Sequence, residues 1–406
     1  MNKSHKIMSL EGLRGIAAFV VVLSHLQTTF YATSSSYIRS SLAFMPDAVA
    51  RTIEAAAASL YNGDFSVWLF WIMSAFVLST QFFLRTHLTS GASSHDYLED
   101  AMLRRYPRLL LPVLVSVMFA YVIHSLGFMH NVLLAHTLGE PYETGWLASF
   151  YRFPPSALGA IKSGVWQSFF AYDPFSTYNG VLWTMEKELY GSIFLFAFLA
   201  LLGHRRSRFL AYPLITLFNI KLGLAWLDAF VAGIVLCDLF VNRNKLQLVQ
   251  LALRWPILNF VRHSRLLTVL FWILVLVSAG FGNIRGSYLV FGTTAVALTL
   301  ISPCTQRFLS SCIPVFLGKI SFGVYLIHLP LICSFSSWAY LTSVSTLGPD
   351  AAAFIVSAVT CGLSIFLGYL LYLIADRPGI HLSRWLSSLI MNTPRNAVLR
   401  TDAIGH

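Results

Sequence analysis

One apolar segment near the start of the chain carries two residues with the chemistry of a reaction site. The segment SLEGLRGIAAFVVVLSHL, residues 9–26, contains Arg14 and His25, eleven positions apart. On a helix these side chains differ by about 20° around the axis and lie about 16 Å apart along it, so they share one face. An imidazole can take and give a proton near neutral pH, as a general base must. The segment alone leaves open a histidine satisfied by a neighbouring helix and an arginine that reaches lipid phosphates.

A second cluster of charge opens another apolar run. In LWTMEKELYGS, residues 182–192, Glu186, Lys187 and Glu188 are consecutive. Glu186 and Glu188 point about 200° apart on a helix, so they do not face the same partner. One of them could line a cavity and orient a histidine or accept a proton. The alternative is an interfacial cluster whose charges pair with one another.

The segment LRRYPRLLLP, residues 103–112, places three arginines at one end of a long apolar run. Clustered guanidinium groups suit bidentate recognition of phosphate. Arg104, Arg105 and Arg108 are therefore candidates for binding an anionic substrate. Contact with lipid headgroups is the alternative interpretation.

A fourth polar set lies in LGKISFGVYLIHLPL, residues 317–331. Tyr325 and His328 are three positions apart and can share a helix face, whereas Lys319 lies about 180° from His328. Pro330 can loosen a helix at that point. A structural histidine remains as open an interpretation as a functional one.

The composition indicates what must position these residues. Of 406 residues, 56% are hydrophobic and only 11% are charged, whereas soluble domains average about 25% charged. The chain is therefore predicted to be an integral membrane protein. Its net charge of +11 comes from basic residues between apolar runs, a pattern that argues against a nucleic-acid partner. The sequence contains no soluble-enzyme motif and no spacing typical of a metal site, and its five cysteines are interpreted as small core residues.

The hydrophobic runs predict the fold. A spanning helix needs roughly 20 mostly apolar residues, and ten candidates are present, at about 10–31, 65–85, 107–129, 181–203, 207–221, 222–241, 266–283, 287–304, 314–336 and 351–375. We expect an all-α, polytopic membrane helix bundle of about ten transmembrane helices, formed by residues 1–385. Residues 386–406 are expected to be a short cytoplasmic tail.

The distribution of basic residues predicts the orientation. With ten spans and an inside N-terminus, 20 of the 28 lysines and arginines fall at inner ends and loops and 5 at outer ones. Positive charge favours the cytoplasmic side. Both termini are therefore expected in the cytoplasm.

Six segments in order resemble the acyltransferase-3 family of integral membrane acyltransferases. The resemblance extends from residue 9 to residue 379, and each segment alone is a weak signal, whereas the ordered set is specific. The segments are LEGLRGIAAFVVVLSH, FWIMSAFVLS, LRRYPRLLLP, LWTMEKELYGS, LGKISFGVYLIHLPL and ADRPG.

The resemblance implies an activity and roles for the candidate residues. Members transfer an acyl group from a cytoplasmic acyl-CoA, with acetyl-CoA as the first guess, to a hydroxyl of an acceptor that is often a carbohydrate. His25 is then expected to be the catalytic base and Glu188 a second catalytic residue that orients a base or the acceptor. No metal is expected. The expected substrate-binding residues are Arg14, Arg104, Arg105, Arg108, Trp183, Tyr325 and His328.

Two other functions remain as alternatives. Ten spans with charges inside them would also suit a polytopic transporter without covalent chemistry, although no internal repeat supports it. An acyltransferase-like protein without activity is the other, because Ala75 and Glu186-Lys187 depart from the usual family pattern. Release of free CoA that depends on the acceptor would distinguish an enzyme from both.

Overall fold

The part of the chain that the structure describes folds into helices alone. The computed structural model describes residues 7–31, 41, 42, 44–88, 92–142, 145–243 and 264–391, and within these ranges every regular element is a helix. The prediction of an all-α fold is confirmed.

The helices fall into three groups by length. The longest are α1 (Met8–Phe30), α4 (Gly63–Leu88), α5 (Ala92–Ser125), α9 (Trp183–Leu202), α17 (Cys312–Leu331) and α19 (Pro349–Leu371). Those of intermediate length are α3 (Asp47–Ser59), α10 (Arg208–Lys221), α11 (Leu227–Val241), α14 (Arg265–Gly280), α15 (Ser287–Ile301), α18 (Ser337–Leu347) and α20 (Arg377–Ile390). The short ones are α6 (Asn131–Leu138), η1 (Leu147–Ser149), α7 (Ala157–Lys162), η2 (Ser163–Gln167), α8 (Ser168–Phe170), η3 (Gly180–Leu182), η4 (Ile284–Gly286), α16 (Pro303–Leu309), η5 (Ile332–Ser336) and η6 (Tyr372–Asp376).

The number of membrane spans differs from the expected one. Five helical stretches of the described chain are long and apolar enough to cross a membrane, and a sixth is added if α15 and α16, bent by 92°, form one span. The five are Met8–Phe30, Gly63–Thr86, Ser94–Ser125, Cys312–Leu347 and Pro349–Ile390. The predicted count of about ten is not confirmed.

Helix length and charge explain the difference. α10, α11, α14 and α15 contain 14, 15, 16 and 15 residues, which gives about 21–24 Å each against a hydrocarbon core of about 30 Å. α9 has 20 residues, but Glu186, Lys187 and Glu188 occupy its first turns. An apolar run in the sequence is therefore longer than the helix that it forms, and counting such runs overestimates the number of helices that can span a membrane.

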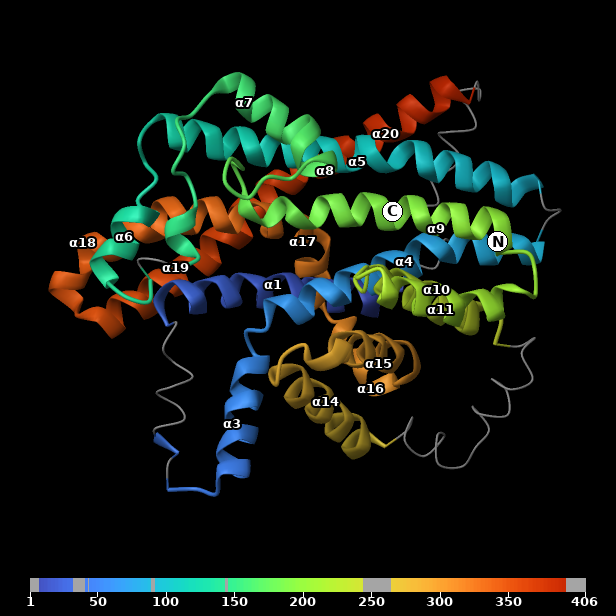
Figure 1. Cartoon of the computed structure of the whole chain (residues 1–406), viewed down its shortest axis with the longest axis horizontal. Coiled ribbons are helices and arrows are strands. Elements are labelled where there is room, and N and C mark those ends of the chain that lie inside the picture. The colour runs from blue at the N-terminus through green and yellow to red at the C-terminus, as the bar shows by residue number, and fades with distance from the viewer. Residues whose placement is uncertain are drawn as a thin grey trace.

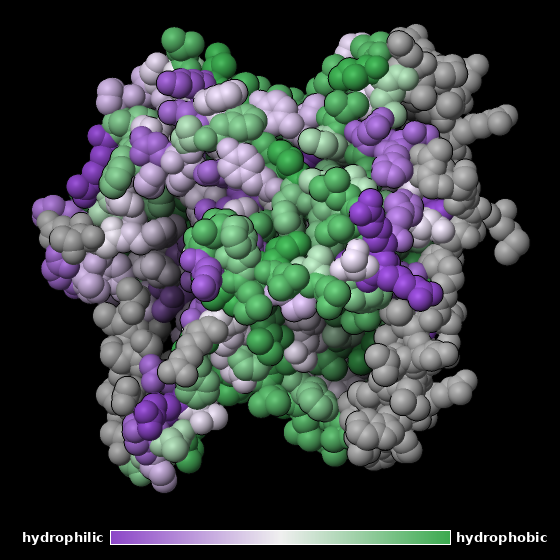
Figure 2. Space-filling model, turned by 45° about the vertical axis from the view of Figure 1, so that its right-hand side comes forward, coloured by the Kyte–Doolittle hydropathy of each residue, from purple (hydrophilic) through white to green (hydrophobic). Residues whose placement is uncertain are grey.

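The surface nevertheless fits an integral membrane protein. Figure 2 shows hydrophobic residues over the middle of one face and hydrophilic residues gathered toward its left and right sides. Large apolar side chains are exposed along α10 and α14, for example Leu210, Leu214, Leu266 and Leu274. An apolar surface between polar ends is what a bilayer requires.

The long helices build the core that carries the candidate site. In Figure 1, α5, α9 and α1 run nearly parallel to the long axis, and α14, α15 and α16 lie beyond α1 on the side away from α5. α17 packs against both α1 and α19. The buried apolar residues around α17 include Leu326 and Leu329, which form one core with Val113 and Val117 of α5.

Glycines let α1 approach α17 closely. A Cβ atom on Gly15 would collide with the backbone of Gly318, and a Cβ on Gly318 would collide with the carbonyl of Glu11. Only residues without a side chain permit this separation. The two helices that carry His25 and His328 are thereby held in direct backbone contact.

The C-terminal end of the described chain is one more helix. α19, η6 and α20 follow one another without interruption to Ile390, so the helix passes the boundary at residue 386. α20 packs against α5, where Oγ of Ser387 donates to Asp100 at 2.7 Å. Most of the expected tail, residues 392–406, lies outside the described residues.

Candidate active site

Two histidines from different helices meet at the centre of the candidate site. Nδ1 of His25 on α1 lies 2.8 Å from Nε2 of His328 on α17. The ring centroids are 5.0 Å apart and the ring planes differ by 23°. His328 is completely buried, whereas His25 keeps some exposure. The pair therefore presents one accessible imidazole supported by one buried imidazole.

The hydrogen bonds determine which nitrogens carry protons. Nδ1 of His328 lies 3.2 Å from the carbonyl oxygen of Val324, one turn earlier on α17. Because a carbonyl only accepts, this nitrogen must donate its N–H. In a neutral imidazole the other nitrogen, Nε2, then accepts, so Nδ1 of His25 must be its donor. Nε2 of His25 is left with a free lone pair, the state that a general base or a nucleophile requires.

An aromatic ring from the segment between α5 and α9 covers His25. Trp146 lies parallel to His25, with ring centroids 4.8 Å apart and planes within 8°. The buried side chain of Asn131 donates to the carbonyls of Leu147 and Phe150, at 2.9 and 3.0 Å. These bonds hold η1, the short helix that follows Trp146. Trp146 was not among the predicted residues, since its only signal was its place in a long loop rich in aromatic residues and proline.

Arg14 lies on the same side of α1 as His25. Its guanidinium donates to Oγ of Ser321 and to the carbonyl of Gly318, both at 3.1 Å, and pairs with Glu11 at 2.7 Å. Its side chain is still 41% exposed. Arg14 and His25 thus both contact α17, about two turns apart along that helix.

Glu188 lies in a separate polar network. Its carboxylate accepts from Arg105 of α5 and from Oγ of Ser74 of α4. Arg105 also donates to Ser192, one turn after Glu188, at 2.8 Å. Both charged side chains are nearly buried. Among the described residues, the structure therefore brings Glu188 together with Arg105 and not with His25.

Tyr325 connects the start of α9 to the histidine pair, whereas Trp183 contacts other residues. The hydroxyl of Tyr325 lies 2.9 Å from Oγ1 of Thr184, one turn before Glu188, and donates to the carbonyl of Val181 at 2.9 Å. The ring of Tyr325 lies 5.9 Å from that of His328. Trp183 packs its edge on Trp71 and its face under the ammonium of Lys187. The start of α9 is thus fixed against α17.

The other two predicted arginines have different environments. Arg104 pairs with Asp100 at 2.7 Å. Arg108 is exposed, and within the described ranges its guanidinium has no hydrogen bond or ion pair. The charges of Arg14, Arg104 and Arg105 repel that of Arg108, while Asp376 attracts it. Arg14, Arg104 and Arg105 are each paired with a carboxylate, whereas Arg108 has no ion pair within the described ranges, which leaves its guanidinium available to an anion.

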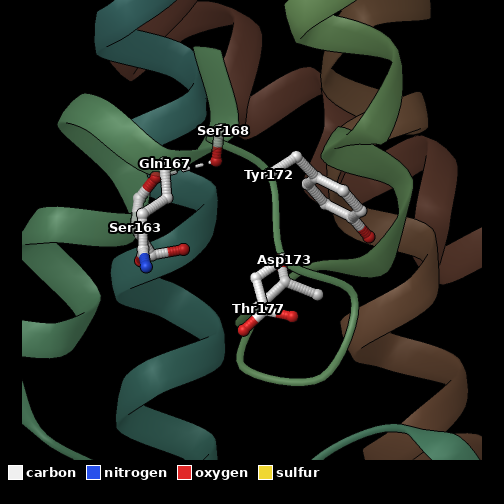
Figure 3. Close-up of a pocket in the computed structure, with 6 residues that line it drawn as sticks. All are labelled: Ser163, Gln167, Ser168, Tyr172, Asp173 and Thr177. Atoms are coloured by element: carbon white, nitrogen blue, oxygen red, sulfur yellow. Dashed lines mark hydrogen bonds between the residues drawn. The ribbon is translucent and has the colours of Figure 1, made fainter. Parts of the chain in front are cut away.

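A small polar hollow lies beside the start of α9. Figure 3 shows its six lining residues, Ser163, Gln167, Ser168, Tyr172, Asp173 and Thr177. The hydroxyl of Tyr172 donates to the carbonyl of Gly180 at 2.9 Å, and burial raises the pKa of this phenol to about 12. Hydrogen bonds from Ser176 and from the backbone of Phe175 lower the pKa of Asp173. These contacts hold the loop that leads into α9.

The described residues offer no alternative centre based on a metal. No group of three or more histidine, cysteine or acidic side chains is close enough to hold a metal ion in this part of the chain.

Comparison with known protein families gives a match over most of the chain. The family model described as an acyltransferase domain matches residues 7–373, nearly the whole chain. No curated protein and no solved structure matches this chain.

Proposed function

We propose a reaction from the premise that this chain belongs to the acyltransferase-3 family and is a membrane acyltransferase. The reaction is transfer of an acyl group from acyl-CoA to a hydroxyl group of an acceptor. The observation that carries the proposal is the His25–His328 pair, whose hydrogen bonds leave Nε2 of His25 unprotonated.

The chemistry follows from that lone pair. Nε2 of His25 takes the proton of the acceptor hydroxyl while the oxygen attacks the thioester carbonyl. The new C–O bond forms, the C–S bond breaks, and His25 returns the proton to the departing CoA thiolate. In a second route Nε2 attacks the thioester carbonyl, the C–S bond breaks and CoA leaves as its thiolate. The acceptor oxygen then displaces the histidine from the acyl group, and the proton of its hydroxyl ends on the CoA thiolate. Both routes need the same nitrogen and release free CoA.

The arginines support an anionic acyl donor such as acyl-CoA. CoA carries several phosphates, and guanidinium groups bind phosphate through paired hydrogen bonds. Arg108 is an exposed residue without an ion pair in the described part of the chain, whereas Arg14, Arg104 and Arg105 each pair with a carboxylate. We assign Arg108 to the donor phosphates, together with the exposed part of Arg14. Arg105 is not assigned to the phosphates, because its donors are directed to Glu188, Ser74 and Ser192.

The identities of the acceptor and of the transferred group are inferred from the family resemblance. We propose an acetyl group and a carbohydrate or glycoconjugate acceptor, with both termini of the chain in the cytoplasm, where acyl-CoA is available. Membrane lipids and acyl-CoA are then the partners.

The test is acyl transfer from labelled acetyl-CoA by purified membranes. We expect labelled product and free CoA from the parent chain, and a loss of about a hundredfold or more in His25→Ala at matched expression. His381→Ala, a change of an exposed histidine on α20, is the matched control and should keep the parent rate. Equal activity in His25→Ala would remove His25 as the reacting group. Uptake of the acceptor into sealed vesicles without release of CoA would instead favour a transporter.

Arg108→Gln tests the donor site in the same assay. We expect the KM for acetyl-CoA to rise about tenfold with kcat little changed, because an exposed guanidinium that binds phosphate contributes on that scale. Arg51→Gln, in the exposed ion pair of α3, is the matched control. An unchanged KM would exclude Arg108 from the donor site.

A further inference from the structure

α17 has a defect in its backbone hydrogen bonding next to His328. Pro330 lies inside the helix and has no N–H. In a regular α-helix that N–H would bond to the carbonyl four residues earlier, which is that of Leu326. His328 lies between these two residues. The catalytic pair therefore depends on a stretch of helix with one carbonyl deprived of its usual donor.

A side chain from another part of the chain supplies the missing donor. Nδ2 of Asn179 lies 2.7 Å from the carbonyl oxygen of Leu326 and donates to it. Asn179 is completely buried. Its other amide atom, Oδ1, has no hydrogen-bond partner in the described part of the chain. The geometry thus uses this asparagine for its N–H and not for its oxygen.

The backbone around Asn179 is fixed. Its N–H donates to Oγ1 of Thr177 at 3.2 Å, and the hydroxyl of Thr177 donates back to the carbonyl of Asn179 at 3.0 Å. Two residues later, the carbonyl of Val181 accepts from the hydroxyl of Tyr325, one turn before His328. Residues 179–181 and 325–326 are therefore joined at two points, both in the turn of α17 that precedes His328.

We propose that Asn179 is a positioning residue that holds the proline-broken turn of α17 so that Nε2 of His328 meets Nδ1 of His25. Its amide takes the place of the N–H that Pro330 lacks. The role deepens the proposed acyl transfer and rests on it, because it acts through the histidine pair. The role requires the N–H donor of the amide, which an aliphatic side chain of similar size lacks.

The role predicts a specific dependence on Pro330. In Asn179→Ala we expect kcat to fall about ten- to a hundredfold with the KM for acetyl-CoA unchanged, because a small displacement of reacting groups is costly. In Pro330→Ala the helix recovers its own N–H, so adding Asn179→Ala should then cost less than about threefold. Asn179→Leu, which has a similar size and no donor, should behave like Asn179→Ala in both backgrounds, and it keeps the test available if the smaller side chain does not fold.

Two control variants make the dependence specific. Pro213 also interrupts a helix, α10, and Pro213→Ala should not relieve the defect of Asn179→Ala. Asn219 is another buried asparagine, whose amide donates to Asp228 at 2.7 Å. Asn219→Ala should lower thermal stability by the same amount with and without Pro330→Ala. An equal loss of kcat from Asn179→Ala in the parent and in the Pro330→Ala background would overturn the proposal.

A measurement of thermal stability does not depend on activity, so it separates this inference from the proposed reaction. The thermal midpoint of the purified protein in detergent should fall in Asn179→Ala and fall less when Pro330→Ala is present. If the parent transfers no acyl group and this coupling is found, the proposed reaction is wrong, but the positioning role of the hydrogen bond from Asn179 to Leu326 is supported. If the parent is active and neither the thermal midpoint nor kcat shows coupling between Asn179→Ala and Pro330→Ala, the positioning role of Asn179 is wrong and the proposed reaction is unaffected.

Discussion

His25 and His328 are separated by 303 positions in the chain, yet Nδ1 of one lies 2.8 Å from Nε2 of the other. The carbonyl of Val324 fixes the proton on the far nitrogen of His328, and that choice fixes the proton on His25. A backbone atom of α17 therefore sets the protonation pattern of a side chain on α1. This relationship predicts that His328 positions His25.

His328→Leu should abolish that support without leaving a large void. We expect kcat to fall about a hundredfold, because the proton on His25 is no longer held at Nδ1. His328→Gln should retain more activity than His328→Leu, since its side-chain oxygen can accept from His25. The measurement is acetyl transfer at matched expression, and equal losses in the two variants would contradict the role as hydrogen-bond acceptor.

Glu188 and Arg105 should behave as a buried ion pair that positions helices. Removing either charge leaves the other buried beside Ser74, so Glu188→Ala or Arg105→Ala should each cost about 3–5 kcal/mol of stability. The double variant should cost clearly less than the sum of the two. Unfolding of the purified protein measures all three. Arg51→Ala, in an ion pair whose side chains are 56% and 61% exposed, should cost no more than about 1 kcal/mol. Additive losses for the first pair would show that the two charges do not interact.

Gly15→Ala tests the close contact of α1 and α17. The new methyl group would meet the backbone of Gly318 and Pro314, so we expect a loss of about 1–3 kcal/mol and reduced transfer activity as the histidines separate. Gly362→Ala on α19 is the matched control, because nothing lies within 4 Å of its Cβ position. It should leave stability unchanged or raise it by up to about 1 kcal/mol through helix propensity. A neutral Gly15→Ala in both assays would mean that the helices can separate without consequence.

His204 should make stability depend on pH. It lies between α9 and α10, where Oγ of Ser94 is 2.9 Å from its Nε2. Burial first, and then the charges of His95 and Arg208, lower the pKa of His204 in the folded protein. The folded state therefore favours the neutral ring. Its contribution to stability is complete above the unfolded pKa of about 6.5 and is lost as the pH falls toward the lowered folded value.

The corresponding measurement compares thermal midpoints near neutral pH and below the unfolded pKa. His204→Gln should reduce the drop in midpoint on acidification, since glutamine has no charge to gain. His381→Gln on α20 controls for the loss of an exposed histidine and should keep the parent's drop. The same drop in parent and His204→Gln would assign the pH dependence to other groups.

The membrane class, the helical fold and the family could be read from the sequence, because they depend on local features. Hydrophobic content, the spacing of Arg14 and His25 on one helical face, and six ordered segments need no information about distant contacts. Both residues indeed contact α17. The number of spans could not be read in this way. Apolar runs do not reveal where a helix stops, and α10, α11, α14 and α15 stop after 14 to 16 residues.

Only the tertiary structure decided which residues meet. Helical periodicity gives the direction of a side chain from its own axis, but a partner on another helix depends on how the two helices are rotated and how closely they approach. Glu188 faces Arg105 of α5 for this reason, whereas the sequence placed it with the chemistry of His25. Trp146 and Asn179 come from irregular segments, whose paths follow no period, and their contacts with His25 and Leu326 exist only in the folded chain.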